Sequence, residues 1–191
     1  MLVYRDNEYT CDAGTALTAV MAAAEAAARR PGRDTAVDLL IDLGEFEAAV
    51  ADQLFPDSDG TNHLERCLRG ASLAAGHAVI AGCERHSTAA HAANVLHQLA
   101  TLRTESLPRQ LVMRLSEGYA YYGLHPYVYA TSARRFADEY SPMQCVCIGT
   151  RSIGTSLSAV VAAALARRGV GIDLYSVRPH GHPFETALDA R

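Results

Sequence analysis

The spacing of apolar residues changes near residue 105, and this change constrains the fold more than any other feature of the sequence. Before it, apolar side chains recur every three or four residues, which is typical of helices packed on one face. After it, short apolar runs alternate with helical patterns, an order typical of parallel strands joined by helical crossovers. We therefore expect an α/β protein in which a helical region, residues 1–105, packs on a small α/β anion-binding unit, residues 106–191.

The first half predicts four helices. They are expected over residues 13–30, over 35–55, from a cap at 61 or 62 onward, and from a cap at 87 to about 103. The second helix has Gly44 in its middle, which we interpret as a place where another element crosses closely. Asp38, Asp42 and Glu45 lie on one face of the same helix, and we expect that face to be in water.

The second half predicts three short strands that alternate with two helices. The strands are expected over residues 111–115, 145–148 and 172–177, and the helices over 127–140 and 155–168. This order predicts right-handed crossovers between parallel strands. The middle strand is too apolar for an exposed edge, and its two cysteines share one face as buried, reduced thiols. We expect a small sheet, which would be incomplete beside that of the family that the chain resembles (below), because the chain stops about 14 residues after the third strand.

All 17 basic residues are arginine, and this composition excludes several classes of enzyme. Schiff-base enzymes, lysine nucleophiles and P-loop NTPases each need a lysine, which the chain lacks. The formal net charge of −4 argues against sequence-independent binding of DNA or RNA, because such binding depends on a basic surface. The N-terminus has no signal-peptide pattern, and no apolar run reaches the roughly 20 residues of a membrane span. We therefore expect a cytoplasmic protein that has no nucleic-acid or membrane partner.

The loop between the second predicted strand and the next helix is the most informative segment for function. It reads Gly-Thr-Arg-Ser-Ile-Gly-Thr-Ser over residues 149–156, one residue away from the Walker A pattern, with a threonine in the place of the lysine. An ATPase is therefore excluded. A phosphate site is favoured, because the start of a helix presents free N–H groups and the positive end of its dipole. The alternative is a tight structural turn. The candidate ligand-binding residues are Arg151, Ser152, Gly154, Thr155 and Ser156.

A second segment follows the third predicted strand. Arg178 comes directly after that strand, so it and Arg151 are expected to converge on one pocket and to suit a doubly charged ligand. His180 and His182 are further ligand-binding candidates that suit acid, base or metal chemistry, and a proline-braced surface loop is the alternative for them.

A third segment, rich in glycine and tyrosine, follows the first predicted strand. Glu117, Tyr119 and Tyr121 are candidates for binding the organic part of a ligand, the tyrosines by stacking on a ring and the glutamate by accepting from a hydroxyl or amine. The alternative for the tyrosines is a cover over the core. The histidines and the cysteine between residues 83 and 97 do not share one helix face, so no metal site is expected there.

These three segments resemble a known family. The stretches Glu117-Gly-Tyr-Ala-Tyr-Tyr-Gly, Arg151-Ser-Ile-Gly-Thr-Ser-Leu-Ser-Ala-Val-Val and Arg178-Pro-His-Gly-His-Pro-Phe resemble uncharacterised bacterial proteins with the phosphoribosyltransferase-like fold. The resemblance covers about the last 80 residues. It implies a site for phosphoribosyl pyrophosphate or a related phospho-sugar, in which residues 149–156 are the loop that touches pyrophosphate. The two adjacent acids and the Thr-Gly-Gly-like turn of type I phosphoribosyltransferases do not occur in the chain.

Two functional hypotheses follow. In the first, the protein binds a phosphorylated small molecule (phosphoribosyl pyrophosphate, a nucleotide or a phospho-sugar), with Mg²⁺ as the one candidate cofactor. Any reaction would be a phosphoribosyltransferase-like transfer, and the sequence assigns no catalytic residue. In the second, the chain is a non-enzymatic subunit or split half, completed by a second copy or by a partner chain, because an incomplete sheet exposes edge strands.

Overall fold

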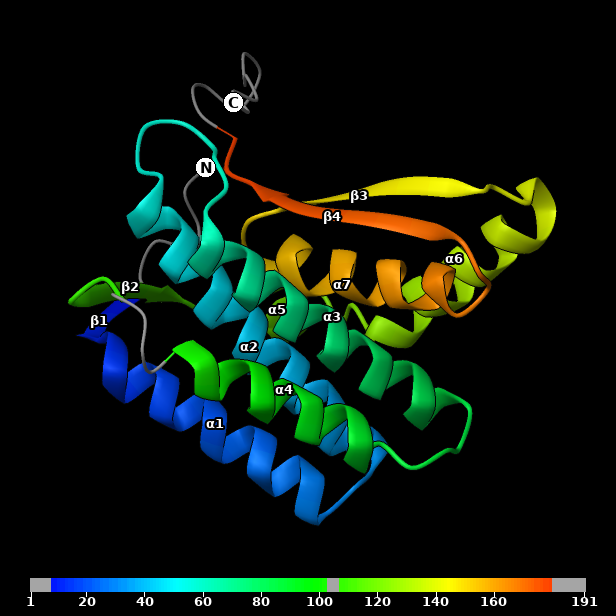
Figure 1. Cartoon of the computed structure of the whole chain (residues 1–191), viewed down its shortest axis with the longest axis horizontal. Coiled ribbons are helices and arrows are strands. Elements are labelled where there is room, and N and C mark those ends of the chain that lie inside the picture. Colours follow the sequence, from blue (N-terminus) through cyan, green and yellow to red (C-terminus); the bar gives the residue numbers. More distant parts are fainter. Residues whose placement is uncertain (1–7, 103–106, 180–191) are drawn as a thin grey trace.

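The computed structural model describes residues 8–102 and 107–179 and shows a mixed α/β protein that is mostly helical (Figure 1). The helices are α1 (Ala13–Arg29), α2 (Arg33–Leu54), α3 (His63–Cys83), α4 (Ala89–Thr101), α5 (Glu117–Tyr121), α6 (Pro126–Tyr140) and α7 (Ile153–Ala166), and the strands are β1 (Glu8–Asp12), β2 (Gln110–Arg114), β3 (Gln144–Thr150) and β4 (Gly171–Val177). The helices expected from the sequence are confirmed, and α5 and β1 are additional. No helix in the described part of the chain is both long enough and apolar enough to cross a membrane.

Capping residues explain where the main helices begin and end. The Asp12 side chain accepts the backbone N–H of Thr15 at 2.9 Å at the start of α1, and the Asn62 side chain accepts that of Glu65 at 2.8 Å at the start of α3. Gly169 lies shortly after α7 with a φ of +83°, the left-handed conformation that glycine adopts without strain. These are local signals, which is why the sequence predicts these helix ends within about two residues.

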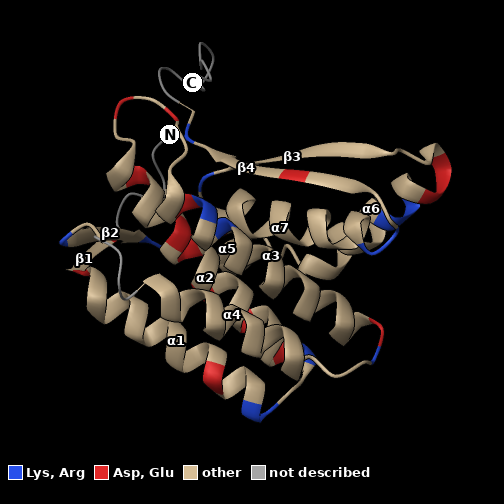
Figure 2. Cartoon of the chain, viewed as in Figure 1, with Lys and Arg blue, Asp and Glu red and all other residues tan. Residues whose placement is uncertain are grey.

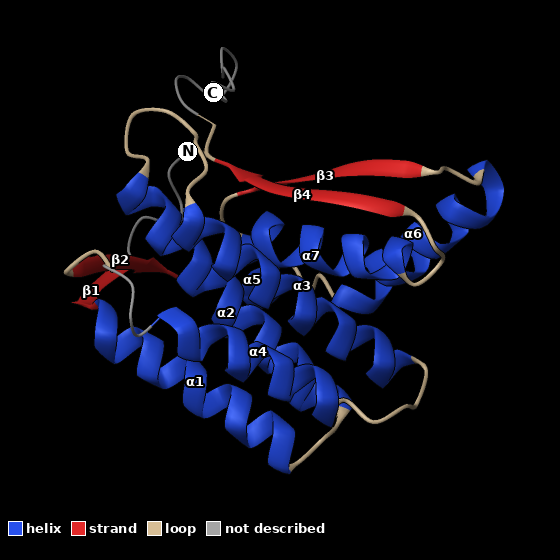
Figure 3. Ribbon diagram, in the orientation of Figure 1, coloured by secondary structure: helices blue, strands red, loops and turns tan. Residues whose placement is uncertain are grey.

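The elements are stacked in layers with α7 near the middle (Figure 3). The β3–β4 sheet lies on α7, and α7 in turn packs on α2 and α3 and beside α6. The helices α1 and α4 cover the far side of α2 and α3. Ten of the 14 residues of α7 are buried, which identifies it as the central core helix rather than an amphipathic surface helix.

Two glycines allow α7 to approach its neighbours closely. A Cβ atom added to Gly44 of α2 would lie 2.7 Å from the Cβ of Ser156. A Cβ atom added to Gly76 of α3 would lie 2.5 Å from the carbonyl oxygen of Ala159. Both separations are far below normal contact distance, so these helices can pack at this spacing only with glycine at the crossing. The interpretation of Gly44 as a close crossing is confirmed.

The strand expected over residues 111–115 is present as β2, but it does not join the parallel sheet. It pairs antiparallel with β1, with Glu8 opposite Arg114 and Asp12 opposite Gln110. The expectation of three parallel strands is therefore wrong for this strand. An apolar run indicates that a strand is partly buried but does not identify its partner. The partner was missed because β1 is short, polar and exposed along most of its length.

The strands β3 and β4 pair in parallel, from Gln144 opposite Gly171 to Thr150 opposite Val177, and α7 forms the crossover between them. This confirms a small parallel sheet, which has two strands within residues 8–102 and 107–179. Figure 2 shows that β3 carries no charged residue along its whole length.

The two faces of β3 have different surroundings. Cys145 and Cys147 share the inner face, where Cys147 is buried against α7, and both are free thiols. Val146 and Ile148 point to the other face and are 59% and 58% exposed. The expectation that this strand avoids exposure is therefore wrong. Its inner face is covered by helices, whereas its outer face has no covering layer in the described part of the chain.

The close packing of α3 on α7 gives a first testable prediction. The substitution Gly76→Ala places a Cβ against the backbone of α7, so we expect the free energy of unfolding to fall by about 1–3 kcal/mol. Gly70→Ala is the matched control in the same helix, because its Cβ would meet only the movable end of the Gln98 side chain. Urea unfolding measures both variants. If the two variants have the same free energy of unfolding, the close packing of α3 on α7 at Gly76 is contradicted.

Candidate functional site

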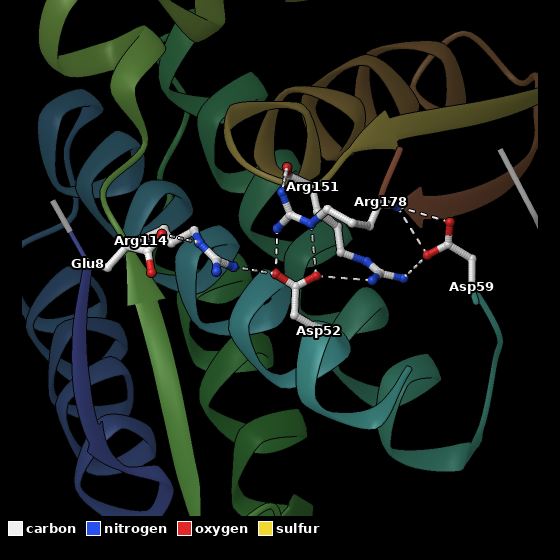
Figure 4. A network of polar contacts seen from close by, with 6 residues as sticks. All are labelled: Glu8, Asp52, Asp59, Arg114, Arg151 and Arg178. Atoms are coloured by element: carbon white, nitrogen blue, oxygen red, sulfur yellow. Dashed lines mark hydrogen bonds and ion pairs between the residues drawn. The ribbon is translucent and has the colours of Figure 1, made fainter. Parts of the chain in front are cut away.

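The carboxyl ends of β3 and β4 hold the two arginines that the sequence singled out. Arg151 directly follows β3 and Arg178 directly follows β4, so parallel pairing brings them to one end of the sheet. Both side chains contact Asp52, near the end of α2 (Figure 4). Asp52 Oδ1 accepts from Arg151 Nη1 and from Arg178 Nε, each at 3.1 Å, and Asp52 Oδ2 accepts from Arg178 Nη2.

A second carboxylate, Asp59 in the loop between α2 and α3, completes this network. It accepts from Arg151 Nη2, and both its oxygens accept the backbone N–H of Arg178, at 3.0 and 2.9 Å. Arg178 Nη1 donates to the carbonyl oxygen of Arg151 at 2.7 Å. The side chains of Arg151 and Asp59 are 1% and 4% exposed, so this ion pair is buried. The network therefore ties the turn after β3 to the helical half of the molecule.

The network extends to the antiparallel pair at its outer side. Arg114 of β2 donates from Nη1 to Asp52 at 2.9 Å and from Nε to Glu8 of β1 at 3.2 Å. These contacts are more open to solvent, with the Arg114 side chain 41% exposed. One aspartate of α2 thus contacts arginines that come from β2, from the end of β3 and from the end of β4.

Arg151 and Arg178 converge as expected, but their guanidinium groups face carboxylates of the same chain. Two arginines opposite two aspartates leave a nearly neutral cluster, and a buried charge is stable only when it is paired in this way. Ligand binding by these two side chains stays a prediction. The same pairing engages the carboxylates of Asp52 and Asp59, and Mg²⁺ held together with a phosphorylated ligand stays a prediction.

The turn between β3 and α7 has an unusual backbone. Ser152 has a φ of 141° and a ψ of −129°, a region that residues with a side chain rarely adopt, and no side chain caps the first turn of α7. A Cβ on Gly149 would collide with the carbonyl group of Gly154, so the turn closes tightly on the helix start. The hydroxyl of Thr155 is buried without a hydrogen-bond partner. The first turn of α7 therefore contains a buried hydroxyl without a partner, while the backbone N–H of Thr155 bonds to the carbonyl oxygen of Ser152 at 3.4 Å.

The tyrosine-rich segment reaches this helix through one side chain. Tyr119 of α5 and Ser156 of α7 share a hydrogen bond of 2.8 Å, and Ser156 also donates to the carbonyl oxygen of Ile153 at 3.0 Å. Burial raises the pKa of Tyr119 to about 12, so the phenol stays protonated at neutral pH. Glu117 is half-buried and Tyr121 is 51% exposed. Tyr119 thus helps to cover the core, which leaves Tyr121 as the more accessible of the two tyrosines.

The acidic face of α2 is not simply solvated. Glu45 Oε1 accepts the backbone N–H of Ser116 at 2.6 Å, at the start of α5, and burial raises the pKa values of both Asp42 and Glu45. The expectation of a solvated face agrees with Asp38 and Asp42, which are exposed, and is wrong for Glu45, which is half-buried. The reason is that Glu45 bonds to the segment that follows β2, a strand that packs along α2, and a helical pattern alone does not reveal such a contact.

A buried glutamate was also missed. Glu47 of α2 is 2% exposed and accepts a hydrogen bond from the hydroxyl of Ser72 on α3. Burial raises its pKa to about 7, although this bond and the nearby Arg69 and Arg151 act to lower it. The sequence spacing indicated that this position is buried, because Glu47 lies four residues after one buried leucine of α2 and three before a buried valine. A charged residue within an apolar stripe indicates a buried polar partner.

His180 and His182 lie outside the described residues. Within the described ranges no three His, Cys, Asp or Glu side chains form a group that could hold a metal ion. Comparison with known proteins adds no relative, since no family model, no curated protein and no solved structure matches this chain.

The burial of the ion pairs predicts that substitution of two different arginines lowers the free energy of unfolding by very different amounts. Arg151→Ala leaves the buried Asp59 without its cation, and we expect the free energy of unfolding to fall by about 3–5 kcal/mol. Arg114→Ala removes a partly exposed pair and should cost less than about 1 kcal/mol. Denaturant unfolding with circular dichroism measures both. Similar losses would show that the network does not hold the two halves together.

Glu47 predicts a pH dependence of stability. In the folded protein the pKa of Glu47 is about 7, whereas in the unfolded chain the pKa of a glutamate is its ordinary value of 4.5. The free energy of unfolding therefore falls as the pH rises from 4.5 to 7, and Glu47→Gln removes this loss. Between about pH 5.5 and pH 8, the variant should gain about 2 kcal/mol relative to wild type. Unfolding curves of wild type and Glu47→Gln are measured at both pH values. If the difference in free energy of unfolding between the two proteins is the same at both pH values, a buried Glu47 that titrates is contradicted.

Proposed function

We propose that the protein binds a phosphorylated small molecule, such as a nucleotide, a phospho-sugar or phosphoribosyl pyrophosphate, at the start of α7. The observation that carries the proposal is the way this helix begins. It starts at Ile153, shortly after the parallel strand β3, and no side chain caps its first turn. The N–H groups of such a turn and the positive end of the helix dipole attract anions, and ligands of α/β proteins gather at this end of the strands.

Two further features of the turn support the proposal. The backbone of Ser152 lies in a region that costs about 1–3 kcal/mol for a residue with a side chain, and such strain is concentrated at binding and catalytic sites. The hydroxyl of Thr155, in the first turn, is buried without a partner, and a buried polar group of this kind needs an acceptor or donor from a ligand or from water. Both features lie within the segment that the sequence singled out.

Arg151 and Arg178 then act as positioning residues. Arg151 is held between Asp52 and Asp59, and Arg178 donates to the carbonyl oxygen of Arg151, directly before Ser152. They fix the turn rather than contact the phosphate. This arrangement prepares the N–H groups of the turn in advance, so less conformational entropy is lost when a ligand binds.

The phosphoribosyl compounds are included because of the family resemblance of residues 149–156. For the organic part of the ligand, Tyr121 is the candidate for stacking on a ring, since it is 51% exposed on the short helix α5, which packs against α7. The proposal concerns binding and includes no reaction.

The experiment changes the charge at the helix start while keeping its shape. The side chains introduced by Ser152→Asp and Ser152→Asn have nearly equal size and both are favourable N-cap residues, so the two variants meet the same backbone constraint and differ in charge. We expect Ser152→Asn to bind within about threefold of wild type and Ser152→Asp to bind about tenfold more weakly, because the carboxylate repels the anion. Calorimetric titration at low ionic strength with pyrophosphate, AMP and phosphoribosyl pyrophosphate measures this. No binding by wild type, or equal binding by the two variants, would overturn the proposal.

A further inference from the structure

The outer face of the β3–β4 sheet is largely apolar, and most of it is uncovered in the described part of the chain. Its charged residue is Asp173, opposite Val146, and Arg69 of α3 lies over the ring of Tyr175 at 4.8 Å. Val146, Ile148 and Tyr175 lie on it, with exposed fractions of 59%, 58% and 38%. Parallel sheets are normally covered on both faces, and a sheet of two strands is marginally stable by itself in water. This face therefore has the properties of a buried surface whose cover is missing.

The free edge of β3 lacks the features that normally protect an edge strand. Within the described residues β3 pairs with β4 on one side and with no strand on the other. Its sequence, Gln-Cys-Val-Cys-Ile-Gly-Thr, contains no charged residue and no proline, the residues that usually prevent edge-to-edge pairing. Its unpaired backbone groups are therefore available to another strand.

An apolar hollow continues this surface from β3 onto α6. A cavity of about 400 Å³ lies between them, with residues of α7 also in its lining, and Tyr129, Phe136 and Val146 are among the side chains that line it. Val146 also lines a second hollow of about 290 Å³ on the outer face of the sheet, beside Tyr175. The outer face, the β3 edge and the groove along α6 are thus one continuous surface, which we call the β3–α6 surface.

The charges on α6 indicate which partner fits this surface. Val128, Phe136 and Tyr140 of α6 are 62%, 42% and 64% exposed. Arg135 and Glu139, one turn apart, are exposed beside them, and neither forms an ion pair within the described ranges. A surface that carries one positive and one negative group, offset along a helix, is complementary to itself after a two-fold rotation.

We propose that a second copy of this chain docks on the β3–α6 surface. The two β3 strands pair antiparallel about a two-fold axis and form a sheet of four strands, in the order β4, β3, β3, β4. The two α6 helices lie side by side beneath the new edge, so that Arg135 of each copy faces Glu139 of the other. An uncharged strand can pair with itself without opposing like charges. The proposal does not depend on the ligand site at α7.

The experiment is a sedimentation-equilibrium measurement of the full chain between about 1 and 100 μM, a range that detects dimers of moderate affinity. We expect wild type to approach twice the chain mass of 20.5 kDa. Val146→Arg places a charge on the exposed side of β3 and should weaken dimerisation at least about tenfold without unfolding the monomer, because this side chain is already 59% exposed. Circular dichroism checks that each variant is folded.

Charge reversal tests the two-fold arrangement itself. Arg135→Glu opposes two acidic groups across the axis and should weaken the dimer, and the double variant Arg135→Glu with Glu139→Arg should restore it. Glu25→Arg on the distant helix α1 is the matched control and should leave dimerisation unchanged. A wild type that stays monomeric at the highest concentration would overturn the proposal. A dimer that survives Val146→Arg, or that the double variant fails to restore, would also overturn it.

Discussion

The pairing of two aspartates with two arginines determines how the halves of this molecule fit together. Asp52 and Asp59 come from the end of α2 and the loop after it, whereas Arg151 and Arg178 come from the turns after β3 and β4. The Arg151–Asp59 pair is almost fully buried, and a buried charge is stable only beside its partner, so this pair favours an arrangement that keeps the turn after β3 against the loop after α2. The position of the turn before α7, and with it the proposed ligand site, is a consequence of that arrangement.

This network also changes the interpretation of a chain whose only basic residue is arginine. The planar fork of arginine binds a carboxylate as well as it binds a phosphate, so two arginines at one sheet end are compatible with either. In this protein they are bonded to carboxylates. The proposed ligand site therefore assigns the positive charge for an anion to the N-terminal backbone of the buried helix α7.

Local patterns predicted most of the elements, and long-range contacts account for most of what was missed. Helix periodicity, caps and the apolar strands after residue 105 are properties of neighbouring residues, and the parallel pair β3–β4 follows from them. The pairing of β2 with β1 and the partners of Arg151 depend on residues far away in the chain, and no short pattern records them. The burial of Glu47 differs from these cases, because the sequence alone shows that Glu47 lies within an apolar stripe of α2, which indicates a buried polar partner.

The antiparallel pair β1–β2 joins residues that are 106 positions apart, from Glu8 to Arg114. Four helices lie between these strands, and closing so long a loop is entropically unfavourable until the helices have packed. During synthesis β1 is made before α1–α4 and its partner strand only after them. The β1–β2 pair can therefore form only once all four of these helices have been made.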